Sequence, residues 1–189
     1  FREPSPFTLP DTAELKRELA AVRQFQATVK ELLIQGHDYG VIPGTDKPTL
    51  LKPGAEKIDK ILHLADTYEQ IGAIEDWGKP LFYYKFKCQL IIMGTNVAVS
   101  EGWGSCSSME GKYRYRWMFG SDVPDHIDKS KLIKQTKKAR KTGKDYIMYR
   151  VENEDIFSLV NTILKMAKKR AHIDASLSAG RLSDVFTQD

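Results

Sequence analysis

The segment from Leu81 to Met93 alternates apolar and polar residues along its whole length. Successive side chains of a strand point to opposite faces, so one face of this strand receives only apolar residues. They are Phe82, Tyr84, Phe86, Cys88, Leu90 and Ile92. A sheet with such a face has to be covered by a helix or by a second sheet. The opposite face carries Lys85 and Lys87, and we expect it to stay available for a ligand.

Further strands are predicted on both sides of this segment. Thr67–Asp76 precedes it, and Asn96–Ser105 follows after a tight Gly94-Thr95-Asn96 turn typical of a hairpin. Lys112–Phe119 is a candidate fourth strand. The strands follow one another closely, which favours an antiparallel β-meander of three to four strands.

Helical spacing of apolar residues predicts three helices. The first runs from about Ala13 to Gln35, is capped by Asp11 or Thr12 and ends at Gly36. The second is a short helix over Ala55–Leu64, with Ile58, Ile61 and Leu62 pointing inward. The third is a long helix over Asn153–Ser178, capped by Asn153 or Asp155, with a buried stripe of Ile156, Val160, Ile163, Ala167 and Ala171. The predicted class is α+β, a meander packed against helices with a long C-terminal helix.

Composition shifts divide the chain into three parts. Residues 1–50 comprise a proline-rich extended arm over residues 1–10, the first helix and a Gly/Pro-rich loop. Residues 51–180 form the core, with a basic insertion near 120–145 that we expect to be a mobile segment or an exposed helix. Residues 181–189 are a tail. The first residue is Phe1, which indicates a processing or other boundary there.

The composition limits the classes of protein to consider. The chain of 189 residues is 41% hydrophobic and 29% charged, as in ordinary globular proteins. No apolar run approaches the roughly 18–20 residues of a membrane span. With only two cysteines, a disulfide framework is not expected. The four histidines are not spaced like zinc ligands. We therefore expect a cytoplasmic protein without a bound metal or membrane partner.

Positive charge is concentrated in one part of the chain. The net charge is only +4, yet the stretch from Lys112 to Arg150 holds twelve Lys or Arg against four Asp. The cations are Lys112, Arg114, Arg116, Lys129, Lys131, Lys134, Lys137, Lys138, Arg140, Lys141, Lys144 and Arg150. This asymmetry suggests a polyanionic partner. The alternative is a charged face that is merely solvated.

The run KYRYRW alternates cations and aromatic residues. On a strand, Lys112, Arg114 and Arg116 share one face, at intervals of roughly 6.5–7 Å that match successive phosphates of an extended nucleic acid. Tyr113, Tyr115 and Trp117 then lie on the other face. Cations interleaved with rings are typical of proteins that hold single-stranded nucleic acid. The competing interpretation is an edge strand protected by cations.

Two other elements carry candidate binding residues. Trp103 stands between Gly102 and Gly104, which allow close approach of a neighbouring strand or a phosphate. Its ring is either a core residue or a stacking platform for a base. On the last helix, Lys165, Lys168, Lys169 and His172 are expected on a broad polar face. Arg170 is spaced to pair with Asp174.

One short pattern raises the question of catalysis. Glu110-Gly111-Lys112 is an E-x-K triplet of the kind found in Mg²⁺-dependent nucleases, and Asp76 or Glu101 are its candidate acidic partners. An isolated triplet is weak evidence. No phosphate-cradling GxxxxGK motif occurs, and Ser105, Ser107 and Ser108 lack a recognisable His/Asp relay. Nucleotide hydrolysis is not predicted.

The order of elements resembles the single-strand annealing proteins of homologous recombination, the superfamily of the eukaryotic Rad fifty-two annealing protein and its phage counterparts. A helix carrying GAEKI precedes the meander, Gly102-Trp103-Gly104 lies in the third strand, and NTILKMAKKRAHIDA forms the closing helix. The likeness covers roughly Leu51 to Gly180. The segments DYGVIPGT and LLKPGAEK, at Asp38–Thr45 and Leu50–Lys57, are similar to those of phage recombination proteins. The basic insertion from Lys129 to Lys144 departs from the family pattern.

This resemblance implies ATP-independent annealing of complementary strands, with no cofactor, by rings or filaments that hold single-stranded DNA in a basic groove. A single-strand-binding protein or an exonuclease is the implied recruiting partner. The candidate DNA-binding residues are Lys85, Lys87, Trp103, Lys112, Arg114, Arg116, Lys137, Lys138, Arg140, Lys168, Lys169 and Arg170. Two hypotheses stay open beside it: a nuclease that uses Glu110 and Lys112, and a phage protein whose basic face binds a host protein.

Overall fold

The computed structural model describes residues 11–42 and 45–188, so the predicted arm over residues 1–10 lies outside the described residues. The chain forms two compact units. Unit 1 comprises Phe1–Glu69, Lys87–Gly104 and Lys169–Asp189, and unit 2 comprises Gln70–Phe86 and Ser105–Lys168. The boundary crosses the long strands and the last helix, which therefore contribute residues to both.

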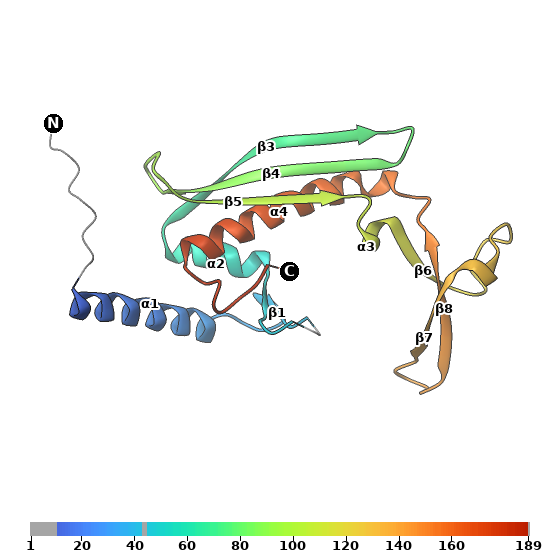
Figure 1. The fold of residues 1–189 in the computed structure, drawn as a ribbon, viewed down its shortest axis with the longest axis horizontal. Helices are drawn as coiled ribbons and strands as arrows, with labels where there is room; N and C mark the ends of the chain where they lie inside the picture. The colour runs from blue at the N-terminus through green and yellow to red at the C-terminus, as the bar shows by residue number, and fades with distance from the viewer. Residues whose placement is uncertain (1–10, 43–44, 189) are drawn as a thin grey trace. The chain divides into compact units, whose positions relative to one another are not determined.

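The predicted meander is confirmed. Strands β3 (Leu64–Asp76), β4 (Leu81–Ile92) and β5 (Ala98–Ser107) form an antiparallel three-stranded sheet in the order β3-β4-β5 (Figure 1). The expected apolar residues of β4 are buried from Phe82 to Leu90. Ile92 is an exception at 39% exposure, because it stands next to the turn of the β4–β5 hairpin, where its N–H donates to the carbonyl of Val97. The α+β class, with sheets packed against helices, is as predicted.

The candidate fourth strand belongs to a different sheet. Strand β6 (Tyr115–Phe119) pairs with β8 (Asp145–Glu152), and β8 pairs with β7 (Ile133–Lys138), giving an antiparallel order β6-β8-β7 within unit 2. The prediction of a mobile or helical basic insertion was therefore wrong over β7. Lysine-rich β7 lacks apolar periodicity, and its extended form depends on hydrogen bonds to β8, which are not visible in local sequence.

The first helix, α1 (Thr12–Leu32), begins as predicted. The Asp11 carboxylate accepts hydrogen bonds from the N–H groups of Ala13 and Glu14, which satisfies two free donors of the first turn. The helix ends before the predicted Gln35. The reason is that the N–H of Ile34 donates to the carboxylate of Asp38 and so leaves the helical ladder.

The other helices also differ from prediction in their bounds. Helix α2 spans Lys52–Ile61, and Ile61, expected inward, is 51% exposed, while Ile58 is buried. A single turn, α3, spans Gly111–Arg114. Short elements complete the chain: β1 (Tyr39–Gly40), β2 (Thr49–Leu50) and the 3₁₀ turns η1 (Lys129–Lys131) and η2 (Phe157–Leu159).

Helix α4 (Val160–Ala179) follows η2 directly, so the helical segment begins later than predicted. Asn153 does not cap it. Its amide nitrogen donates to the carbonyl of Tyr113, and its amide oxygen accepts from the N–H of Asp155. The predicted buried stripe is confirmed at Ile156, Ile163, Ala167 and Ala171. His172, placed on the polar face by its spacing, is buried instead.

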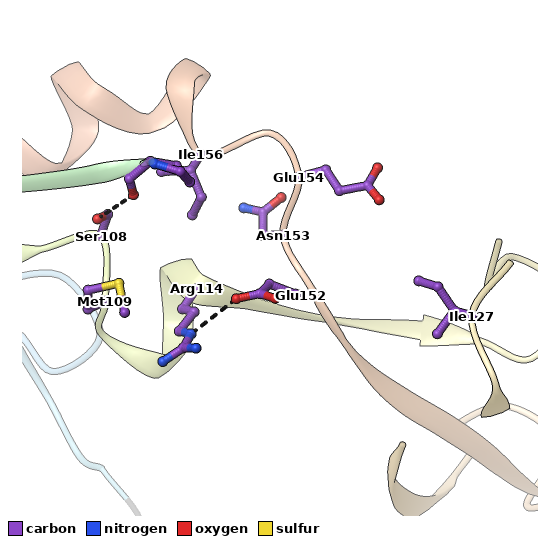
Figure 2. Close-up of a pocket in the computed structure, with 9 residues that line it drawn as sticks. Ser108, Met109, Arg114, Ile127, Glu152, Asn153, Glu154 and Ile156 are labelled. Carbon is purple, nitrogen blue, oxygen red and sulfur yellow. Dashed lines mark hydrogen bonds and ion pairs between the residues drawn. The ribbon is translucent and has the colours of Figure 1, made fainter. Parts of the chain in front are cut away.

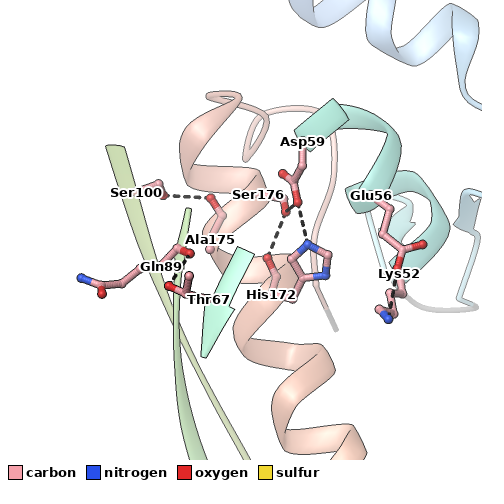
Figure 3. Close-up of polar contacts among 9 residues, drawn as sticks. All are labelled: Lys52, Glu56, Asp59, Thr67, Gln89, Ser100, His172, Ala175 and Ser176. Atoms are coloured by element: carbon pink, nitrogen blue, oxygen red, sulfur yellow. Dashed lines mark hydrogen bonds and ion pairs between the residues drawn. The ribbon is translucent and has the colours of Figure 1, made fainter. Parts of the chain in front are cut away.

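Close contact between β5 and α4 organises the core of unit 1. A Cβ added to Gly102 would lie 2.2 Å from the nitrogen of Ala175 and 2.4 Å from the carbonyl oxygen of Ala171. The Ser100 hydroxyl donates to the carbonyl of Ala175, and the N–H of Trp103 donates to the Asp174 carboxylate (Figure 3 shows Ser100 and Ala175). The close approach predicted for this glycine is therefore made by a helix backbone.

An ion pair between the buried Asp38 and Lys57 connects the Gly/Pro-rich region to α2. Asp38 is fully buried and accepts hydrogen bonds from Lys57 at 2.6 Å, from His37 at 2.8 Å and from the N–H of Ile34 at 2.9 Å. Burial alone would raise the pKa of Asp38, but these bonds outweigh it and lower the pKa from 3.8 to about 2. Gly54 is required beside it, because an added Cβ would lie 2.3 Å from the Asp38 carbonyl oxygen. The segments at residues 38–40 and 53–57 are therefore held against each other in the fold.

We predict that Gly102→Ala lowers the free energy of unfolding by about 1–3 kcal/mol or prevents folding, because the new methyl group would overlap the α4 backbone. Chemical denaturation measures the effect. Gly40→Ala is the matched control, since nothing lies within 4 Å of a Cβ there. Equal stability of the two variants would contradict the close contact.

A second prediction concerns acid stability. Because the pKa of Asp38 is lowered from 3.8 to about 2, the ionised carboxylate contributes stability above pH 3.8, which is lost as the pH falls through 2. We expect Asp38→Asn to be less stable than the parent by roughly 1–2 kcal/mol at pH 6, and this difference to shrink below pH 3. Urea unfolding at several pH values tests it. A difference that does not change with pH would disprove the assignment.

Candidate nucleic-acid interface

One face of the β6–β8–β7 sheet combines aromatic rings and cations. The register places Trp117 opposite Arg150, Phe119 opposite Met148, and Lys137 opposite Tyr146. Residues directly opposite in an antiparallel pair share a face, and so do alternate residues of one strand. We call the rings and cations of this face the aromatic platform, and they are Tyr115, Trp117, Phe119, Lys137, Tyr146 and Arg150. The same face also holds Ile133, Gln135, Met148 and Glu152.

Rings and cations of the aromatic platform are in contact. The Arg150 guanidinium lies 4.3 Å from the centroid of the Tyr115 ring, and Lys137 Nζ lies 5.9 Å from that of Trp117. The rings of Phe119 and Tyr146 are 5.4 Å apart. Trp117 is 37% exposed and Phe119 48% exposed. Large rings that remain accessible beside cations are suited to stack on bases while the cations meet phosphates.

The opposite face of this sheet is also basic. Arg116, Lys134 and Lys138 lie there by the register, and Lys134 Nζ is 5.7 Å from the Tyr149 ring centroid. Arg140, in the loop after β7, is exposed. Because β7 is an edge strand, its lysines also serve to deter pairing with another sheet.

The predicted ladder of three cations on one strand is wrong. Lys112 and Arg114 lie in α3, where the carbonyl of Glu110 accepts the N–H groups of Tyr113 and Arg114, and only Arg116 is on β6. Lys112 is 3.5 Å from Glu110, and Arg114 is 3.3 Å from Glu152. Tyr113 is buried. The helical turn removes the regular spacing on which the prediction depended.

The open face of the β3–β4–β5 sheet is not a row of available cations. Lys87 is paired with Glu69 at 3.0 Å, and this hydrogen bond raises the pKa of Lys87. Gln89 donates to Glu101 on the neighbouring strand. Lys85, in unit 2, is half-buried. The acidic neighbours leave this face with mixed charge.

The remaining candidates have different degrees of exposure. Trp103 is 48% exposed, so its interpretation as a core residue was wrong and the stacking interpretation remains. Lys168 is exposed, whereas Lys169 and Arg170 are half-buried. The expected partner of Arg170, Asp174, receives the N–H of Trp103.

The predicted DNA-binding residues are divided between the two units. Unit 1 holds Lys87, Trp103, Lys169 and Arg170. Unit 2 holds Lys85, Lys112, Arg114, Arg116, Lys137, Lys138, Arg140 and Lys168. Sequence reasoning missed Arg150 and Tyr146 as site residues. The signal in the sequence is the run Tyr146–Val151, whose aromatic and cationic residues resemble those of KYRYRW.

The residues proposed for a nuclease have other roles. Glu110 Oε1 accepts the N–H of Ser107, and Asp76 Oδ1 accepts those of Gly78 and Lys79 in the β3–β4 turn. Glu101 is in the other unit and bonds Gln89. Among residues 11–42 and 45–188, no three His, Cys, Asp or Glu side chains are placed to hold a metal ion.

A pocket of about 340 Å³ lies beside α3 (Figure 2). Pro80, Met109 and Ile156 provide apolar walls, and the Arg114–Glu152 pair and Asn153 provide polar groups. The amide of Asn153 is occupied by backbone partners, and the Arg114 guanidinium is bound by Glu152. The Ser108 hydroxyl, also in the lining, donates to the carbonyl of Pro80 and accepts the N–H of Phe82. The polar groups of the lining are therefore engaged within the fold.

A buried polar group joins α2 to α4 in unit 1 (Figure 3). His172 Nε2 is 2.6 Å from Asp59 Oδ2, and the Ser176 hydroxyl is 3.1 Å from the same oxygen. All three residues are buried. Ser176 contacts the carboxylate rather than an imidazole nitrogen, so the arrangement lacks the base that would activate a nucleophile. Its geometry fits a structural link between the helices.

In the described part of the chain, no helix combines the length and apolar character needed to cross a membrane. Comparison of the chain with known protein families, with curated proteins and with solved structures finds no match.

We predict that Trp117 accounts for quenching of tryptophan fluorescence by an oligonucleotide. A base stacked on its ring quenches emission, and Trp117→Phe should remove most of that quenching. Titration with a short oligo-dT measures it. The control is Trp77→Phe, because Trp77 is in the same unit and 58% exposed but stacks on Phe157. Undiminished quenching in Trp117→Phe would exclude Trp117 from the stacking site.

Proposed function

We propose that this protein binds single-stranded DNA on the β6–β8–β7 sheet and promotes annealing of complementary strands without ATP. The observation that carries the proposal is the aromatic platform, where the exposed Trp117 lies beside Lys137 and Tyr115 lies under Arg150. Stacking on rings tolerates any base, and cations neutralise any phosphate. The combination therefore favours a single strand of any sequence.

The geometry supports a single strand over a duplex. In a duplex the faces of the bases are stacked on one another and are unavailable to Trp117 or Phe119. In a single strand they are accessible, and cation contacts release bound counterions. The surrounding stretch, with twelve cations against four Asp, supplies the attraction for the backbone.

Annealing follows from the same contacts. Lys and Arg neutralise each bound strand, so two strands repel one another less, and complementary bases can then pair without a chemical step. Assembly into rings or filaments, and recruitment by a single-strand-binding protein or an exonuclease, remain part of the proposal through the family resemblance. Within the site, Lys137 and Arg150 take the main role, because they lie on the aromatic platform. Arg116, Lys134 and Lys138 lie on the opposite face and add to the attraction for the backbone. Lys87, Lys112 and Arg114 are secondary because acidic neighbours pair with them.

We predict that replacing Lys134, Lys137 and Lys138 together by Ala weakens binding to single-stranded DNA and reduces its salt dependence. Loss of the Lys137 contact on the aromatic platform should reduce the slope of log K against log salt by about 0.7. Loss of Lys134 and Lys138 from the opposite face should lower the affinity further by weakening the attraction for the backbone. Fluorescence anisotropy at 50–300 mM salt measures both quantities. The control, Arg17, Lys30 and Lys60 to Ala, removes the same charge from exposed positions in unit 1.

An annealing assay with complementary oligonucleotides then tests the function. We expect faster annealing with the parent protein and the control variant, and little acceleration with the β7 variant. An unchanged salt slope in the β7 variant would reject the proposed surface. Cleavage of either strand with Mg²⁺ present would favour the nuclease hypothesis. Absence of oligonucleotide binding at low salt would favour a protein partner for the basic face.

A further inference from the structure

The first half of α1 exposes an apolar stripe to solvent. Leu15 is 46% exposed, Leu19 49% and Val22 36%. Every residue from 11 to 24 is exposed, and the helix joins the core of unit 1 toward its C-terminal end, through Val29 and the following Leu33. Phe25 packs partly against this core, and the Gln26 amide donates to the carbonyl of Arg181. The exposed stripe therefore continues, along the same helix, a face that is buried further on.

The exposed N-terminal half of α1 would be stabilised by a partner that covers its apolar stripe. Short isolated helices are marginal in water, and an amphipathic helix gains most of its stability from burying its apolar face. Unit 1 covers that face at Val29 but not at Leu15, Leu19 or Val22. A partner that covers these three residues would remove the largest exposed apolar surface of the helix from water.

The spacing of the stripe identifies the kind of partner. The stripe repeats at alternating four- and three-residue steps, which is the a/d pattern of a coiled coil. Its positions are Leu15, Leu19, Val22, Gln26 and Val29. In this pattern Leu15, Val22 and Val29 occupy d, while Leu19 and Gln26 occupy a. A second helix with the same repeat fits this seam.

The charges beside the seam select a second copy of the chain and its direction. The e positions hold only cations, Lys16, Arg23 and Lys30, while Glu18 holds a g position. In a parallel, in-register pair, g faces the e residue five positions later in the partner, so Glu18 meets Arg23 of the partner subunit twice. In an antiparallel pair, e faces e, and the cations would repel one another.

We propose that two copies of this chain associate through a parallel, in-register pairing of α1, with Leu15, Leu19 and Val22 in the seam and Glu18–Arg23 ion pairs across it. The contact has twofold symmetry, so the same surface of each copy is used and the pair is closed. The seam is short, and the association is a concentration-dependent monomer–dimer equilibrium. The inference does not rest on DNA binding, because α1 is in unit 1 and the aromatic platform is in unit 2.

Charge reversal tests the pairing. Glu18→Arg and Arg23→Glu should each raise the dissociation constant of the dimer by about tenfold, and the double variant, which exchanges the two charges, should restore it. Sedimentation equilibrium measures the constant, and circular dichroism confirms that each variant is folded. Arg17→Glu is the matched control, because Arg17 occupies the outer f position. A monomer at all concentrations, no restoration in the double variant, or assemblies insensitive to these changes would overturn the proposal.

Cross-linking tests the register. Leu15→Cys places a thiol at a d position, where the two copies meet, and mild oxidation should give a covalent dimer. Ala21→Cys lies on the outer face and should not cross-link. The natural Cys88 and Cys106 are buried and do not interfere. Equal cross-linking at both positions would overturn the parallel seam. Oligonucleotide binding by the Glu18→Arg variant separates this result from the proposed function, since it should equal that of the parent.

Discussion

The contact between β5 and α4 is the constraint on which unit 1 depends. Gly102 has no side chain, so the backbones of strand and helix approach until an added Cβ would lie within 2.4 Å of helix atoms. Close-packed interiors tolerate no such overlap, and small residues Ala171 and Ala175 on the helix match the glycine on the strand. The same approach places Asp174 where it accepts the N–H of Trp103. The exposed ring of Trp103 is therefore held by a backbone that cannot move away from the helix.

The burial of polar side chains in unit 1 follows from this packing. Once α4 is fixed on the sheet, His172 and Ser176 are directed inward and need partners, because burying a polar group without a hydrogen bond is costly. Asp59 of α2 provides the partner for both. A second buried carboxylate, Asp38, joins the loop after α1 to α2 through Lys57. Two charged or polar links thus orient α2.

Ion pairs with glutamates also decide which cations remain available to bind a ligand. Lys87, Lys112 and Arg114 stand out in the sequence, yet each lies beside a glutamate that the fold brings near. Surface pairs of this kind add little stability, but they reduce the positive potential offered to a phosphate. Lys112 and Arg114 also lie over rings, but the platform cations Lys137 and Arg150 contact rings without a glutamate partner among the described residues. A ring leaves the charge of Lys137 or Arg150 uncompensated, and this is why the proposed binding surface lies on the β6–β8–β7 sheet.

The sequence by itself determined the elements whose side chains repeat with a clear period. The alternation of β4 and the buried stripe of α4 were predicted because burial of one face imposes that period. It also determined the Asp11 cap, a purely local interaction. Only the tertiary structure decided the strand character of β7, the burial of His172 and the helical turn that separates Lys112 and Arg114 from Arg116. Each depends on partners distant in sequence: hydrogen bonds from β8, the carboxylate of Asp59, and the pairing of Asn153 with the end of α3. Local pattern carries no information about such partners, because they become neighbours only when the chain has folded.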